Sequence, residues 1–490
     1  MAVILLTSTA TSWQVPFDWS STNTINLLGS GASGFAGGTS GTYQYGGHGG
    51  GGGGYSKFTN VAYTAGSVFP VNVGSAAAAS TNAFTGNTGD ITFIDDGNYA
   101  SISYIAKNTV SGAGGGTLNP LTITTPTGTA NGDLMIAVAM TATNLPGLVG
   151  PGWIPLINSN GLTVAYKYAQ SEPASQTFYG PFGNYSASVL TFRGALFDVI
   201  STAASGTTTV TVPSATATAS SSISVVFVGQ ATGTGGSYGT PTGYTLATSD
   251  YDATACASAV FYETGVAAGA TGTVAVTSSI TPSGTSWGIQ LILRPKPSKF
   301  AQGGNAGGSV GASSVTAFGG YGLTFNGGNG GGSAATTTAS QFFSGGGGGG
   351  AAGPNGAGAA GAAGSTGSTN PSGGGGGGGG GGTAGSGSTG GNGSGGSGFG
   401  GNGAQPSSLS QATTGVAGSE IASPYGSGGG GGGGSSGYFS SLGTNYGGGG
   451  GGGGGTGTLF LGGSLGVAGA IIISYTNATI VQANQFFEMF

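Results

Sequence analysis

The sequence predicts an all-β protein, in which a jelly-roll-like β-sandwich is inserted into a glycine-rich domain of short strands and packed polyglycine-II-type helices. Short β-branched and aromatic runs recur between turn residues, without helical periodicity. Glycine supplies 116 of 490 residues and forms uninterrupted runs on both sides of the middle of the chain. One strongly apolar strand, 469–475, follows the last glycine run and needs partners from elsewhere, because a lone strand is not stable.

The β-sandwich is predicted over residues 113–297, which contain an internal repeat. Each half has the order strand, Pro/Gly-aromatic turn, strand and closing strand with an arginine. The first half consists of 132–138, 151–156, 162–168 and 189–193, and the second of 223–228, 241–246, 259–263 and 289–294. Alternating pieces such as 208–212 and 273–277 are typical of half-buried strands. About 180 residues are enough to bury a core.

The flanking segments are predicted to form one interrupted domain. Residues 1–112 supply an opening strand around Trp13 and a hairpin over 59–74, and residues 298–476 continue the domain with glycine runs and the closing strand. This strand is expected to pair with the N-terminal strands. Residues 477–490 form a C-terminal tail, and its apolar end 486–490 and residues 1–6 are candidates for anchoring to neighbouring proteins.

The glycine runs, of which 373–382 is the longest, allow three interpretations. They are flexible linkers, silk-like cross-β layers, or extended helices with three residues per turn. Cross-β packing is typically built with alanine or serine, which these runs lack. The extended helix has no internal hydrogen bonds, so side-chain-free neighbours can bond to one another through their backbones. We favour this bundle, in which ten residues span about 31 Å and turns such as 353–356, 369–372 and 423–426 reverse the chain.

Composition excludes several classes of function. Seven Lys and Arg residues against twelve Asp and Glu residues give a net charge of -5, which argues against a nucleic-acid surface. The single cysteine, Cys256, excludes a disulfide framework. The N-terminus lacks a basic region, so it is a poor signal peptide, and no apolar run is long enough to span a bilayer.

No convincing catalytic or metal site is found, and we expect a protein without enzymatic activity or cofactor. The only histidine, His48, lies beside a glycine run and gives a hydrolase triad no credible base. Residues 95–98 (Asp-Asp-Gly-Asn) suit a calcium turn but equally a plain hairpin turn. Asp250 and Asp252 are expected to be solvated. Glu172 and Glu263 are conceivable as a glycosidase pair, but they occupy matching strand ends in the repeat, which favours a shared structural role.

Binding is better supported than catalysis. Six aromatic residues border glycine runs, where a bundle would place its connecting loops, and aromatic side chains on loops suit stacking on sugars. The alternative is that they plug the ends of the bundle as a small core. The candidates for receptor binding are Tyr43, Tyr45, Tyr425, Tyr438, Phe439 and Tyr446.

The order of these motifs resembles a known family. Residues 11–16 with Trp and Pro, the run at 47–54, the hairpin 63–74 and the closing strand 469–475 are similar to the glycine-rich domain of bacteriophage and prophage tail proteins. The Gly-Asp-Leu of 132–134 and the Pro-Gly-Trp of 151–153 resemble a phage-associated β-sandwich, although the insertion of a sandwich departs from the family pattern. The long glycine tract is similar to phage fibre-tip adhesins with stacked polyglycine-II helices.

The resemblance implies a virion structural protein, a tail-fibre or tail-tip adhesin that contacts a host surface glycan or outer-membrane protein. It implies partners among other virion proteins, a homo-oligomer with a trimer as one option, and no nucleic acid. A capsid or tail decoration protein that docks to other virion proteins is the alternative. A depolymerising enzyme is a third class, disfavoured by the scarcity of acidic residues.

Overall fold

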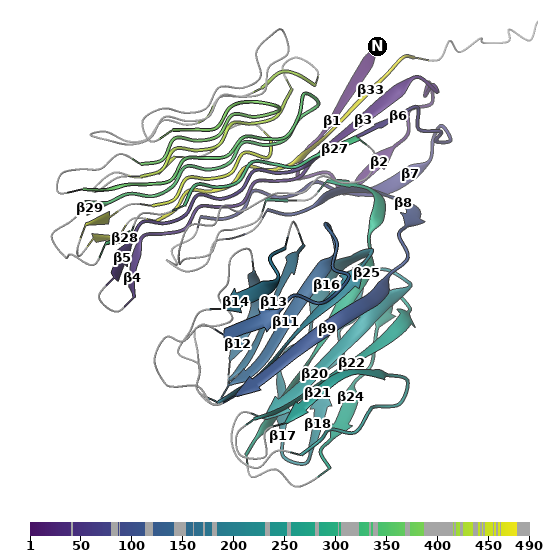
Figure 1. The fold of residues 1–490 in the computed structure, drawn as a ribbon. Coiled ribbons are helices and arrows are strands. Elements are labelled where there is room, and N and C mark those ends of the chain that lie inside the picture. Colours follow the sequence, from purple (N-terminus) through teal and green to yellow (C-terminus); the bar gives the residue numbers. More distant parts are fainter. Residues whose placement is uncertain are drawn as a thin grey trace, which may run out of the picture.

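A computed structural model gives the fold of the chain (Figure 1). It describes residues 1–40, 43–79, 87, 89–112, 121–141, 153–159, 161–169, 172–178, 184–230, 236–251, 256–279, 284–301, 303–304, 323–332, 335–336, 342–367, 373–386, 415, 418–421, 425–434, 440–441, 443, 446–453, 455–456, 459–460 and 462–477. Within these ranges the regular elements are all strands, and every pair of named strands is antiparallel. The predicted all-β fold class is therefore confirmed.

The N-terminal and C-terminal segments together form a small sandwich, which we call the base. Its first sheet has the order β1 (Ala2–Leu6), β33 (Ala470–Tyr475), β3 (Asn23–Leu28), β6 (Tyr55–Thr59) and β27 (Leu323–Phe325). Its second sheet has the order β2 (Ser12–Gln14), β7 (Val68–Asn72), β8 (Thr92–Tyr99) and β26 (Pro297–Ala301). The predicted pairing of the closing strand is confirmed, because Ile473 of β33 lies opposite both Ile4 and Ile25.

The inserted segment is built from two repeats with the same topology. The first repeat forms a sheet in the order β12 (Ile154–Ser159), β13 (Leu162–Tyr168), β11 (Leu134–Thr141), β15 (Tyr185–Arg193) and β9 (Ser103–Gly112). The second repeat forms the equivalent order β21 (Thr245–Tyr251), β22 (Ala257–Val266), β20 (Ser222–Gln230), β25 (Ser286–Pro295) and β16 (Ala195–Ile200). The internal repeat of the sequence thus supplies four strands of each sheet, and β9 and β16 are the fifth strands. The insertion therefore includes residues 103–112, which the sequence placed in the N-terminal part of the glycine-rich domain.

Each repeat also carries a two-stranded ladder on the outer face of its sheet. The ladders are β10 (Leu121–Thr124) with β14 (Ser175–Phe178), and β18 (Thr209–Val212) with β24 (Val274–Thr277). The shortest strands of the second repeat are β17 (Ala204–Gly206), β19 (Thr216–Ala217) and β23 (Gly269–Ala270). The insertion therefore has four layers, with the two large sheets face to face in the middle.

The core follows from this layering. β11 and β20 are central strands buried on both faces, so they are continuously apolar or small rather than alternating. Leu134 and Ile136 point into the cluster between the two large sheets, together with Val225 and Phe227 of the other repeat. The intervening Met135 points instead toward its own ladder. A separate outer cluster lies beneath each ladder.

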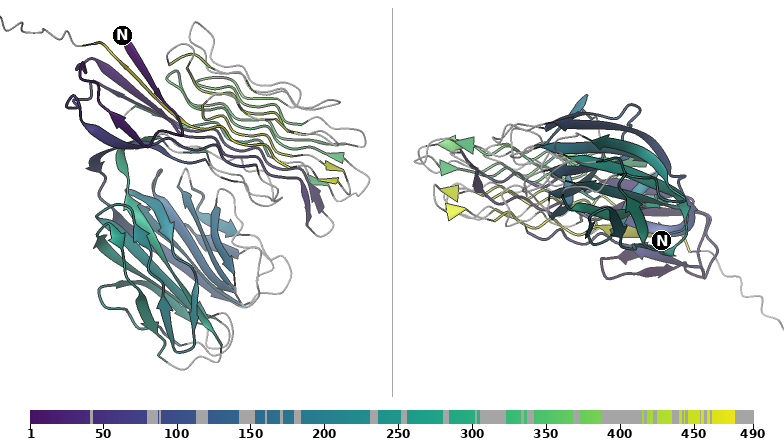
Figure 2. Two further views of the ribbon diagram at one scale, coloured as in Figure 1. Left: turned by 180° about the vertical axis from the view of Figure 1, so that it is seen from behind. Right: turned by 90° about the horizontal axis from the view of Figure 1, so that it is seen from below.

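The insertion joins the base through two strands that pair with each other. The chain leaves the base at the end of β8 and returns along β26, with Phe93 opposite Phe300. Figure 2 shows the four-layer body and the glycine-rich body as separate parts connected at this place. We call the pair β8 and β26, with residues 100–102 and Lys296, the neck.

Candidate functional site at the tip of the glycine bundle

The glycine runs form a bundle of extended segments bonded through their backbones. Segment 345–352 donates to three neighbours, and partners on the same neighbour recur at every third residue. The acceptors are residues 47, 50 and 53 on the first neighbour, residues 434, 431 and 428 on the second, and residues 362 and 359 on the third. The distances between donor nitrogen and acceptor oxygen are 2.7–3.0 Å. This period is that of a helix with three residues per turn, whose polar groups all point outward.

The carbonyl groups of the same segment accept from three further neighbours. The donors are Gly449 and Gly452, then Gly374, Gly377 and Gly380, then Gly328 and Gly331. Segment 345–352 therefore has six bonded neighbours, and segment 446–453 likewise bonds to six others within the described residues. The central segments can be buried without side chains because nearly all of their backbone N–H and C=O groups form hydrogen bonds with neighbouring segments.

Close packing explains why the central segments are pure glycine. A Cβ atom added to Gly349 would lie 2.0 Å from the carbonyl oxygen of Gly328, and one at Gly350 would lie 2.2 Å from that of Gly378. Segments at the edge need glycine only where they face inward. Gly358, Gly361 and Gly364 face the bundle at three-residue spacing and have alanines between them. The linker and cross-β interpretations are thereby replaced by the bundle for the described residues.

The longest run does not form one straight rod of about 31 Å. Gly373–378 extends toward the base, and the chain then turns, with φ of +32° at Gly380 and +75° at Gly381. Residues 383–386 run back beside it, because Gly378 donates to Thr383 and Gly375 to Ser386. The expectation of a single ten-residue helix was wrong, since glycine itself adopts the left-handed backbone of the turn. The predicted reversal at 353–356 is confirmed by two bonds between Gly353 and Gly356.

The bundle has two ends of different character. One end meets the base, where Leu28, Tyr55, Ala352 and Ile472 form a buried cluster. The other end, which we call the tip, lies far from the base and carries short strands (Figure 1). They are β4 (Gly38–Ser40), β5 (Tyr43–Tyr45), β28 (Ala335–Thr336), β29 (Phe342–Phe343), β30 (Thr366–Gly367), β31 (Gly455–Thr456) and β32 (Leu459–Phe460).

The six aromatic candidates divide between these ends. Tyr43 and Tyr45 belong to β5 at the tip, in a hairpin with β4. Tyr425 and Tyr446 are half-buried and pack against the cluster at the base, so they contribute to the plug that the alternative interpretation described. Tyr438 and Phe439 lie outside the described residues. The structure thus brings the first two together and separates them from the second two.

The plug at the base also contains a carboxyl group. Glu420 accepts from the backbone N–H of Ser427 at 2.8 Å and from its hydroxyl group. Burial raises the pKa of Glu420 above its ordinary value. The hydroxyl of Tyr55 donates to the Oδ1 atom of Asn26 at 2.6 Å, and burial followed by the charge of Glu420 raises the pKa of Tyr55. The contact between Glu420 and Ser427 joins residues 418–421 to residues 425–434, and Ile421 and Tyr425 pack against the cluster at the base.

The tip includes aromatic positions that sequence reasoning missed. Phe343 of β29 is fully buried, and its backbone pairs with β30 and β31. Phe460 lies in β32, at the edge of the same small sheet. Both border a glycine run, as Tyr43 and Tyr45 do, so the same signal in the sequence would have found them.

The carboxylates considered for catalysis have structural partners. The carboxylate of Glu172 forms a buried ion pair with Lys167 at 2.5 Å, under the ladder of the first repeat. Glu263 lies in β22 of the second repeat, opposite Ser224, whose hydroxyl bonds Tyr244 in the other outer cluster. The two glutamates therefore lie on outer faces of opposite sheets and do not form a facing pair.

The acidic turn at 95–98 and His48, the other candidates for a metal or catalytic site, are held in structural contacts. Asp95 and Asp96 pair with Arg294 and Lys299 in the neck. His48 is buried in the bundle beside Phe35, and burial lowers its pKa to about 4. Among the described residues, no group of three or more His, Cys, Asp or Glu side chains is placed to hold a metal ion.

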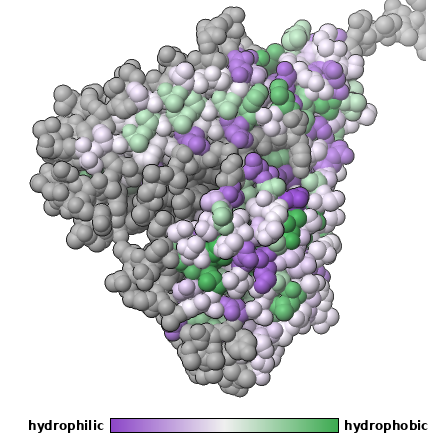
Figure 3. Space-filling view, in the orientation of Figure 1, coloured by the Kyte–Doolittle hydropathy of each residue, from purple (hydrophilic) through white to green (hydrophobic). Residues whose placement is uncertain are grey.

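Comparison of the chain with known protein families, with curated proteins and with solved structures finds no significant match. In the part of the chain that the structure describes, no helix has the length and apolar character needed to cross a membrane. On the face drawn in Figure 3, hydrophilic and hydrophobic residues are interspersed over the inserted body.

Proposed function

We propose that the protein is a structural component of a bacteriophage virion, a tail-fibre or tail-tip adhesin. It contacts a glycan or an outer-membrane protein of the host surface with the turns at the tip of the bundle, and it docks to other virion proteins. The observation that carries the proposal is the six-neighbour bonding of segments 345–352 and 446–453. A scaffold held by its backbone can present turns of varied sequence on a fixed frame.

The bundle suits presentation rather than chemistry. Its segments are held by hydrogen bonds to their neighbours along their whole length, so the bundle does not depend on the sequence of the turns at the tip. A surface with few charges limits nonspecific electrostatic attraction, since charged residues are 4% of the chain. Tyr43 and Tyr45 provide aromatic residues at the tip, where stacking on sugar rings or protein side chains is entropically inexpensive.

The proposal is tested by competition for host cells. Purified protein, added before phage, should reduce adsorption to the strain in which the particle propagates. The variant Tyr43→Ser/Tyr45→Ser should lose this effect while keeping the thermal unfolding of the unchanged protein. Phe17→Ser is the matched control, because Phe17 is an aromatic residue at the base with 76% exposure. Equal blocking by both variants would place the contact away from the tyrosines.

A second experiment separates the adhesin from a decoration protein. Gold-labelled antibodies against the purified protein should mark the distal end of the tail in electron micrographs of particles. Label spread over the capsid or along the tail tube would contradict the adhesin function and support the decoration protein. Absence of label from all particles would overturn the assignment to a virion.

A further inference from the structure

The neck concentrates charge in a chain that has little. Three of the seven cationic residues, Arg294, Lys296 and Lys299, lie within six positions of one another. Arg294 and Lys299 pair with Asp95 and Asp96 in the middle of β8. Entry and exit strands thus carry opposite charges where they pair.

The contact between Lys299 and Asp96 is the most enclosed of these. Lys299 Nζ lies 2.5 Å from Asp96 Oδ2, and the aspartate side chain is only 2% exposed. The hydroxyl of Tyr63 donates to the same oxygen at 2.9 Å, which ties the neck to the segment between β6 and β7. The predicted hairpin over 59–74 was wrong, because β6 and β7 belong to different sheets of the base and this segment crosses from one sheet to the other. Burial raises the pKa of Asp96, but the hydrogen bond and charge of Lys299 outweigh it and the pKa is lowered.

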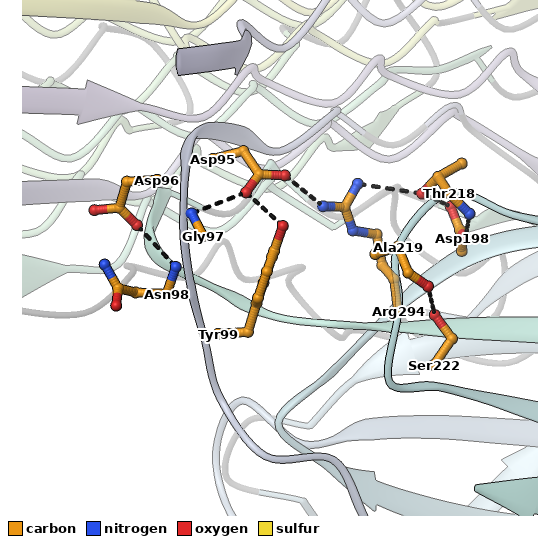
Figure 4. A network of polar contacts seen from close by, with 10 residues as sticks. All are labelled: Asp95, Asp96, Gly97, Asn98, Tyr99, Asp198, Thr218, Ala219, Ser222 and Arg294. Carbon is orange, nitrogen blue, oxygen red and sulfur yellow. Dashed lines mark hydrogen bonds and ion pairs between the residues drawn. The ribbon is translucent and has the colours of Figure 1, made fainter. Parts of the chain in front are cut away.

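Arg294 bridges the base and the insertion (Figure 4). It comes from β25 of the second repeat, and its Nη2 atom lies 3.4 Å from Asp95 Oδ2 of the base. Its other terminal nitrogen donates to the hydroxyl of Thr218 at 3.3 Å, and its guanidinium lies 5.0 Å from the ring centre of Phe93. The backbone N–H of Thr218 in turn donates to Asp198 at 2.8 Å. Arg294 of β25 therefore contacts β8 of the base directly and is linked through Thr218 to Asp198 of β16.

Lys296 is the single residue between β25 of the insertion and β26 of the base, and it contacts both parts. Its Nζ atom donates to the carbonyl oxygen of Gly132 at 2.9 Å and lies 4.9 Å from the ring centre of Phe300. Its backbone N–H donates to Gly194 at 2.8 Å, and its carbonyl accepts from Ala100 at 2.9 Å. Entry linker, exit linker and both repeats are thus tied to one residue.

We propose that the neck is a charge-latched joint that holds the inserted body at one angle to the base and its bundle. Domains joined by a modest interface are ordinarily expected to move relative to each other. Here two paired strands limit twisting, and ionic contacts on both sides of the pair limit bending. The bundle tip and the insertion are then carried as one rigid body, whatever either of them binds.

The proposal is tested by distance measurement between spin labels. Cysteines are introduced at Thr366 in β30 and at Thr211 in β18, both exposed, and the buried Cys256 is replaced by serine. The unchanged neck should give a narrow distance distribution. The variant Arg294→Gln/Lys299→Gln should broaden it about twofold, because the inserted body regains the motion expected of a tethered domain.

Arg193→Gln is the matched control. It removes an ion pair of the same kind, Arg193 with Asp133 at 2.9 Å, that lies wholly within the insertion. Its distribution should stay narrow. If the double variant does not fold, Asp95→Asn serves instead, because it keeps the shape of the side chain and removes the charge that faces Arg294. The amide oxygen of the asparagine can still accept from the Gly97 N–H group and the Tyr99 hydroxyl. A distribution that is already broad in the unchanged neck, or one that no neck variant alters, would overturn the proposal.

Discussion

Replacement of one central glycine by alanine should destabilise the whole bundle. We choose Gly349→Ala, because Gly349 lies in a segment with six bonded neighbours. The new Cβ atom would lie 2.0 Å from the carbonyl oxygen of Gly328, whereas real Cβ contacts essentially never fall below 3.0 Å. The two segments must therefore separate by about 1 Å, which is the difference between these distances.

The expected cost follows from the bonds that such a shift breaks. The hydrogen bonds between the two segments are those from Gly328 to Gly350 and from Gly331 to Gly347, both at 2.7 Å. An added ångström takes these beyond hydrogen-bonding distance, and each buried group left without a partner costs roughly 1–3 kcal/mol. Alanine also lowers the conformational entropy of the unfolded chain, and this offsets about 0.4–1 kcal/mol of the loss. We expect a net loss of about 3–5 kcal/mol, a large part of the roughly 5–15 kcal/mol stability of an ordinary protein.

The assay is hydrogen exchange of peptides from 344–352, read by mass spectrometry together with the thermal unfolding of the protein. Gly239→Ala is the control, because a Cβ atom there would meet its nearest neighbour, the oxygen of Thr277, at an ordinary 3.5 Å. The control should change stability by no more than about 1 kcal/mol. Equal exchange in both variants would refute the close-packed arrangement of the bundle.

Three further predictions test the edge of the bundle and two buried titrating groups, His48 in the bundle and Lys296 in the neck. Gly361→Ala should destabilise the bundle, because its Cβ atom would lie 2.1 Å from the oxygen of Gly347, whereas Ala363→Ser at an exposed edge position should leave its thermal unfolding unchanged. Burial lowers the pKa of His48 to about 4, so the unfolded state binds more protons and stability should rise by about 3 kcal/mol between pH 4 and 6.5. His48→Gln should remove this part of the slope in denaturant titrations. Burial also lowers the pKa of Lys296 to about 8, so stability should rise from pH 8 toward 9.5 by about 1–2 kcal/mol, and Lys296→Met should flatten that rise.

Much of the strand pattern was visible in the sequence. The apolar closing strand required partners, and the N-terminal strands were the simplest choice, as the pairing of Ile473 with Ile4 and Ile25 confirms. The repeat in the middle segment predicted equivalent elements in each half. Its division into two sheets, each with its own ladder, depended on long-range pairing that a local pattern does not contain.

The sequence predicted which aromatic residues border glycine runs, but not which end of the bundle each of them occupies. Aromatic residues at the borders of glycine runs look alike in the sequence, yet Tyr43 lies at the tip and Tyr446 in the plug at the base. The difference depends on the direction of each segment and on where the chain reverses. The turn at Gly380 and Gly381 shows why this was hidden, because a reversal inside an unbroken glycine run leaves no mark in the sequence.

The glycine runs and the strand patterns beside them were enough to predict segments that pack without side chains and are flanked by strands. Uninterrupted runs mark segments such as 345–350. The edge segment 358–364, with an inward-facing glycine at every third position, was recognised only in the structure. Only the tertiary structure decided which segment bonds to which, and therefore which turns reach the tip. The physical reason is that glycine helices recognise one another through identical backbone groups, so their register is set by the ends of the segments, the base and the turns.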